Sequence, residues 1–338
     1  MAAVVGTREP RRPVALVLQT LAVAACYFGA GRLGLVRRLT VEGAIFTPIW
    51  PPTGVAVAAL LIFGIRAWLG IAIGALLVVL SISSFSSFQP SAFGIVAGNT
   101  IAPVCAYLML RRLGFRIDVS RLRDGLALVF LAALGSMLIS ATVDVGLLVL
   151  TDKIAADSFG EVWLAWWVGD AMGVLIVTPV LLMLYGIRPP LRPTRWKEAA
   201  LLVVAACVLV PLATHSPISL LFLVYPLLVW AALRFQHGGS VLCALFASVM
   251  ATVAATDGVG PFAGLSDTEL MIKLQAFNGS MALTALLLSA VITEQRNTRR
   301  SVELACQELV QVLEHLTAGN ASTRPPTADG DGRQLGAP

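Results

Sequence analysis

The stretch WLAWWVGDAMGVLIVTPVLLMLYG, residues 163–186, decides the fold class of this chain. It carries a single charged residue, Asp170, in an otherwise apolar run. A helix needs about 20 apolar residues to cross the hydrocarbon core of a bilayer, so the stretch predicts a membrane span. An ionisable group in hydrocarbon is costly, and Asp170 is therefore a candidate for a functional site.

The composition extends this prediction to the whole chain. Of its 338 residues, 57% are hydrophobic and 13% are charged, and the mean hydropathy is +0.84. A soluble globular chain carries about 25% charged residues. We predict an all-α, polytopic membrane bundle of about 8–10 transmembrane helices. The apolar runs number about ten, or eight if closely spaced runs join: 14–30, 49–65, 67–83, 92–110, 125–150, 163–186, 198–214, 218–234, 239–256 and 270–293.

Loop charges predict the orientation. With the N-terminus inside, 17 arginines and lysines fall in cytoplasmic segments and 5 in outer loops, which is a positive-inside bias. The formal net charge of +5 therefore reflects membrane topology and does not indicate nucleic-acid binding. We expect a multi-pass membrane protein with both termini in the cytoplasm. The loop 31–48 goes against the bias, so it is either interfacial or its arginines face an outer pocket.

The chain is expected to have four parts. Residues 1–13 form a cytoplasmic N-terminal segment and 14–293 an integral membrane domain. Residues 294–317 form a cytoplasmic amphipathic helix, in which a seven-residue apolar repeat indicates either a short coiled coil or a solvated helix end. Residues 318–338 lack an apolar period and are predicted to be disordered.

Five polar residues interrupt the apolar runs at a similar depth in the predicted outer half. Asp170 and Asp144 lie about 10 Å and 9 Å below the outer ends of their runs, at 1.5 Å per residue. Each aspartate either pairs with an arginine of the loop 31–48, or contacts a ligand or a proton. The asparagines have an alternative role in hydrogen bonds between helices. The candidate pocket residues are Asp170, Asn99, Gln275, Asp144 and Asn278, with Trp50 and Trp167 as its walls.

No catalytic or metal-binding pattern appears in the sequence. The five cysteines form no CxxC pair, and they are typical of small apolar residues in helices. The three histidines have no metal-ligand spacing, and the phosphate-binding and nucleophile-elbow motifs are absent. We therefore predict that the chain is not an enzyme and needs no cofactor or metal.

Several short motifs occur in a characteristic order along the runs. They are Trp50-Pro51-Pro52-x-Gly54, Gly64-x-Arg66, Gly98-Asn99, Trp166-Trp167-x-Gly169-Asp170-x-x-Gly173, Pro179, Trp230, Arg234-Phe235, Gly260-Pro261-Phe262, Leu274-Gln275-x-Phe277 and Glu294-x-Arg296. On these motifs the chain resembles the bacterial membrane-associated sensor domain of type 1 (MASE type 1), over about 14–296. It departs from that pattern at Leu69, where the family often has proline, and at Gln236-His237.

The resemblance implies a sensor of the bacterial inner membrane, in a family usually fused to a histidine kinase or a diguanylate cyclase and generally assigned eight spans. Because no such domain follows residue 296, we expect a stand-alone sensor that passes its signal to a separate cytoplasmic partner of one of these types. A homodimer is a further expected partnership. The alternative is a transporter or permease subunit for a small solute. Against it, the sequence shows no internal repeat and no polar residues in the inner halves of the runs.

Overall fold

The computed structural model describes residues 11–41, 44–82, 91–186 and 195–322. The chain divides into two compact units, Met1–Thr293 and Glu294–Pro338. The predicted segment 1–13 lies almost entirely outside the described residues, and so do 323–338 of the predicted tail. Residues up to Ser322 continue the last helix, five positions into the segment predicted to be disordered.

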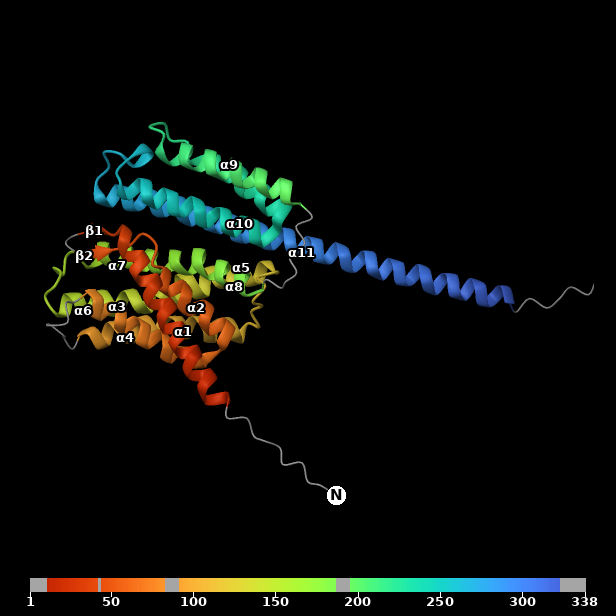
Figure 1. The fold of residues 1–338 in the computed structure, drawn as a ribbon, viewed down its shortest axis with the longest axis horizontal. Coiled ribbons are helices and arrows are strands. Elements are labelled where there is room, and N and C mark those ends of the chain that lie inside the picture. The colour runs from red at the N-terminus through yellow and green to blue at the C-terminus, as the bar shows by residue number, and fades with distance from the viewer. Residues whose placement is uncertain (1–10, 42–43, 83–90, 187–194, 323–338) are drawn as a thin grey trace, which may run out of the picture. The chain divides into compact units, whose positions relative to one another are not determined.

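The described chain is almost entirely helical, which confirms the all-α prediction (Figure 1). A two-stranded antiparallel hairpin, β1 (Leu39–Val41) and β2 (Ala44–Phe46), interrupts the helices in the loop 31–48. The helices are α1 (Arg11–Gly34), α2 (Pro51–Phe63), α3 (Trp68–Ile82), α4 (Ser91–Arg112), α5 (Leu122–Ala127), α6 (Met137–Leu150), α7 (Phe159–Met172), α8 (Thr178–Gly186), α9 (Trp196–His215), α10 (Val224–Thr256) and α11 (Asp267–Ser322). Two π-helical segments, Leu128–Ser136 and Gly173–Val177, join α5 to α6 and α7 to α8.

Within the described residues, eight helical stretches are long and apolar enough to cross a membrane. The run 49–65 is not among them, because α2 has only 13 residues and spans about 20 Å. The two prolines at its start and Gly64 at its end, with φ of 77°, fix both boundaries.

The runs 218–234 and 239–256 appear as one stretch, Leu221–Thr256, but the chain reverses inside it. Gln236 has φ of 56° and ψ of −142°, far from helical values. Arg234 pairs with Glu198 near the start of α9, whereas Gly260, after the end of α10, packs against Thr214 at the end of α9. Residues 224–235 and 237–256 are therefore antiparallel, and the first segment is too short to cross a bilayer alone.

Glycines allow neighbouring helices to approach closely, as the GxxxG spacings predict. A Cβ on Gly70 would lie 2.7 Å from the Thr20 carbonyl oxygen, and one on Gly74 would lie 2.7 Å from the Tyr27 Cβ. The α1–α3 interface therefore depends on these two glycines. A large buried apolar cluster joins α2, α4, the α5–α8 segments and α11, so α11 is part of the membrane core.

One end of the unit Met1–Thr293 carries the β1–β2 hairpin, the α6–α7 connection and the turn between α10 and α11 (Figure 1). We call it the hairpin end. The polar residues singled out in the sequence lie about two to three helical turns from the helix termini at this end.

Both termini should lie in the cytoplasm, with the hairpin end outside, because of the charge bias of the loops. Alkaline phosphatase fusions placed after Thr293 should be inactive, and fusions in the α6–α7 connection should be active. The reverse pattern of activity would invert the orientation and place the polar residues near the inner surface.

Candidate functional site

The first of two sequence motifs, Trp50-Pro51-Pro52-Thr53-Gly54, starts α2 and docks directly on α7. The Trp50 backbone N–H donates to the Gly169 carbonyl oxygen at 3.0 Å. The Thr53 hydroxyl donates to the Asp170 carbonyl oxygen at 3.0 Å and to the Trp50 carbonyl oxygen at 2.7 Å. Because the two prolines have no N–H groups, the first turn of α2 leaves fewer donors to satisfy where it meets the other helix.

Glycines of the second motif, Trp166-Trp167-x-Gly169-Asp170-x-x-Gly173 at the end of α7, make this contact possible together with Gly54 of α2. A Cβ on Gly173 would lie 1.9 Å from the Trp50 carbonyl oxygen and 2.4 Å from the Thr53 hydroxyl oxygen. A Cβ on Gly54 would lie 2.3 Å from the Gly173 carbonyl oxygen, and one on Gly169 would lie 2.7 Å from the Thr47 carbonyl oxygen. Two backbones therefore touch without side chains between them, which fixes the position of Asp170.

A cavity of about 980 Å³ adjoins this contact at the hairpin end. Its volume is within the range of small-molecule sites, roughly 300–1,000 Å³. Residues of α1, α3, α4, α6 and α7 line it, together with Trp50 at the start of α2. The polar, charged and aromatic lining residues are Tyr27, Arg32, Arg38, Thr47, Trp50, Ser81, Ser91, Asn99, Asp144, Lys153, Trp166 and Asp170.

The two aspartates of the cavity are almost completely buried, Asp170 at 7% and Asp144 at 2% exposure. The Ser140 hydroxyl donates to Asp170 Oδ2. The Asn99 amide donates to Asp144 Oδ2 at 2.6 Å. Asp144 Oδ1 has no hydrogen-bond partner among the described residues, and it lies against Gly98, where a Cβ would approach it to 2.7 Å.

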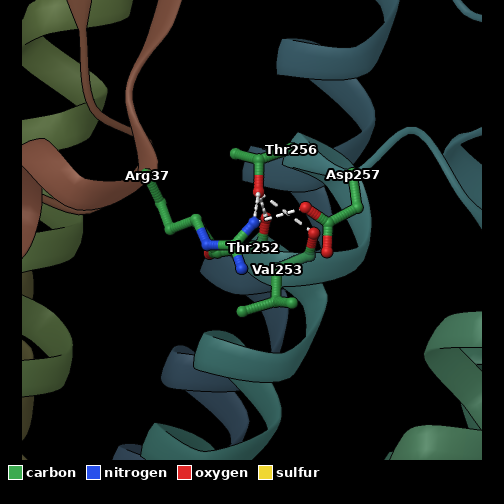
Figure 2. Close-up of polar contacts among 5 residues, drawn as sticks. All are labelled: Arg37, Thr252, Val253, Thr256 and Asp257. Atoms are coloured by element: carbon green, nitrogen blue, oxygen red, sulfur yellow. Dashed lines mark hydrogen bonds and ion pairs between the residues drawn. The ribbon is translucent and has the colours of Figure 1, made fainter.

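Among the described residues, no ion pair joins either aspartate to an arginine. Figure 2 shows that Arg37 instead contacts Asp257 and Thr256 at the end of α10, the latter at 3.3 Å. Arg32 and Arg38 line the cavity. The proposed pairing of the aspartates with this loop is therefore absent here. The loop 31–48 has three arginines, and two of them, Arg32 and Arg38, face a pocket, as one of the two interpretations of this loop expected.

The other predicted pocket residues lie outside the cavity lining. Gln275 Nε2 donates to the Pro48 carbonyl oxygen at 2.7 Å, next to the cavity residues Thr47 and Trp50. Asn278 is fully buried and accepts a hydrogen bond from Ser248 at 2.9 Å, which joins α11 to α10.

Trp167 also lies outside the cavity lining. Its neighbour Trp166 lines the cavity in the place that was predicted for Trp167. The Trp167 indole N–H donates to the Leu134 carbonyl oxygen at 2.9 Å, and its ring stacks on Trp163. Consecutive helical residues point about 100° apart, so only one tryptophan of the pair can face the cavity.

Sequence reasoning missed Tyr27, Ser140, Lys153 and Trp166. Ser140 precedes Asp144 by one helical turn, so its helix face was readable from the spacing. Tyr27 gave no comparable signal, because α1 reaches the cavity only through its packing on α3. No group of histidine, cysteine or acidic residues in the described part of the chain could hold a metal ion.

Comparison with known families gives a match over most of the chain. The family model MASE1, a membrane-associated sensor domain, matches residues 19–296, which cover most of the chain and both docked motifs. Among curated proteins and among solved structures, no match is found.

Proposed function

Because the chain belongs to the MASE1 family of membrane-associated sensor domains, which are non-catalytic, we propose that it detects an extracytoplasmic small molecule or proton through the cavity at its hairpin end. The observation that carries this proposal is a pair of buried carboxylates, Asp144 and Asp170, in a cavity without a cationic partner among the described residues. A charged carboxylate buried without such a partner is costly, so both residues are candidates for contact with a cationic ligand group or a proton.

A route from the cavity to α11 supports signal transmission. Thr47 and Trp50 line the cavity, and the Pro48 carbonyl oxygen between them accepts the hydrogen bond from Gln275 of α11. A ligand that moves this segment would therefore act directly on α11. It can shift the equilibrium between two α11 positions only if it binds those two states with different affinity.

The expected output is a contact of α11 with a separate cytoplasmic protein, a histidine kinase or a diguanylate cyclase, or with a second copy of the chain. Val302 and Leu309 of the predicted coiled-coil repeat are 56% and 63% exposed, as an interaction surface requires. We propose the bacterial inner membrane as the location, with both termini cytoplasmic. The transporter alternative gains no support from the family match.

Asp170→Asn should leave the protein folded and change its output. The asparagine keeps the size of the side chain and an oxygen for the Ser140 hydroxyl, while the charge is lost. For an aspartate paired with an arginine, the same change would cost about 3–5 kcal/mol. Here we expect a loss below about 1.5 kcal/mol, the scale of one hydrogen bond, in thermal melts of the purified protein.

Output can be measured by joining a diguanylate cyclase catalytic domain to α11 at Leu316 and assaying cyclic di-GMP in cells. We expect Asp170→Asn to change this activity at least threefold. Asp257→Asn is the matched control, because Asp257 pairs with Arg37 outside the cavity lining. Unchanged cyclase output in a folded Asp170→Asn protein would contradict the sensor proposal.

A further inference from the structure

We propose that the ligand of this cavity is a small zwitterion, with its ammonium group toward Asp144 and Asp170 and its anionic group toward Arg32, Arg38 and Lys153. This inference rests on the proposed sensor function and specifies the chemistry of its ligand. It is argued from the order of charges along the cavity.

The deep part of the cavity is anionic. Asp144 lies six residues, about 9 Å, below the end of α6, and its Oδ1 is a buried acceptor without a partner among the described residues. Asp170 and Tyr27 line the same cavity. Trp50 adds an aromatic face to the lining, which favours a cation. An ammonium group supplies both the charge and the N–H donors that these atoms lack.

The rim of the cavity is cationic. Arg32 lies in the last turn of α1, Arg38 precedes β1, and Lys153 follows the end of α6, all at the hairpin end. Arginine and lysine bind carboxylate and phosphate oxygens through charge-assisted hydrogen bonds.

The depth of Asp144 bounds the ligand length. A ligand that reaches from Asp144 to the rim can carry its two charges up to about 9 Å apart, a span that an amine and an acid joined by roughly five methylene groups approach. Two sources have this chemistry: a soluble amino acid or short peptide, and the phosphoethanolamine headgroup of a lipid. The volume of about 980 Å³ has room for either.

The test uses the full chain in phosphatidylcholine nanodiscs, with 6-aminohexanoate as the probe and hexanoate and hexylammonium as matched halves. Binding is followed by the fluorescence of Trp50 and Trp166 and by thermal melts. We expect 6-aminohexanoate to bind at least tenfold more tightly than either half. Asp144→Asn should weaken 6-aminohexanoate at least tenfold and leave hexanoate unchanged, while Arg38→Gln should weaken hexanoate. Asp257→Asn should change neither.

Nanodiscs that contain phosphatidylethanolamine distinguish the two sources. Competition by this lipid against 6-aminohexanoate supports a headgroup ligand, and binding without competition supports a soluble one. The zwitterion proposal is overturned if hexanoate binds as tightly as 6-aminohexanoate, if Asp144→Asn leaves both affinities unchanged, or if no probe binds. In each of these cases, a cyclase chimera that still responds to Asp170→Asn would leave the sensor proposal standing.

Discussion

Gly173→Ala is expected to destabilise the membrane domain by about 3 kcal/mol or more, the upper end for overpacking a core. The new Cβ would lie 1.9 Å from the Trp50 carbonyl oxygen, closer than any non-bonded contact allows. The obstructing atom belongs to a backbone that is held by hydrogen bonds to Gly169 and Thr53, so it cannot rotate away as a side chain would. Thermal melts in detergent should show a large loss, or the protein should fail to accumulate in membranes.

Gly146→Ala is the matched control. Gly146 lies in α6, and a Cβ there would meet no atom within 4 Å. Alanine is favoured over glycine in a helix by roughly 0.5–1 kcal/mol, so this variant should be neutral or slightly more stable. If Gly173→Ala melts at the temperature of Gly146→Ala, the close contact between the α2 and α7 motifs does not exist in the membrane.

Gln275→Met is expected to abolish signal transmission while the cavity keeps its ligand affinity. Methionine has nearly the size and flexibility of glutamine, but it cannot donate to the Pro48 carbonyl oxygen. The link between the cavity wall and α11 is then lost. The buried Pro48 carbonyl group is left without this donor, which should lower stability by about 1–3 kcal/mol. In the cyclase chimera, output should no longer change when Asp170→Asn is added.

Lys273→Met provides a control on the same helix. The Lys273 amine donates to the Pro261 carbonyl oxygen in the turn before α11, away from the cavity lining. This variant removes a comparable contact and should leave the effect of Asp170→Asn intact. A Gln275→Met chimera that still responds to Asp170→Asn would show that the signal reaches α11 by another contact.

The sequence by itself determined the helical class and most of the chain's passes. Hydrocarbon requires each crossing segment to satisfy its own backbone hydrogen bonds, so a run such as 163–186 is readable without knowledge of its neighbours. The free-energy cost of placing an ionisable group in hydrocarbon singled out Asp144 and Asp170 in the sequence, and the structure places both beside one cavity. The family resemblance read from the motifs is confirmed by the match over residues 19–296.

Only the tertiary structure decided which polar residues share a site. Asn99 and Asp144 meet because α4 packs on α6, whereas Gln275 and Asn278, at a similar distance from the hairpin end, contact Pro48 and Ser248 instead. Depth can be read from the position of a residue in its own run. The direction in which its side chain points depends on how that helix is rotated against its neighbours.

The tertiary structure also decided the path of the chain at α10 and the partner of Arg37. The chain reverses at Gln236, which breaks the helix. Arg37 contacts Asp257, which is distant from it in the sequence. No local pattern encodes such contacts, because they follow from which helix faces fit together. The hydrophobicity of each segment can be read from its own residues. Packing depends on contacts between segments, which form only when the helices assemble.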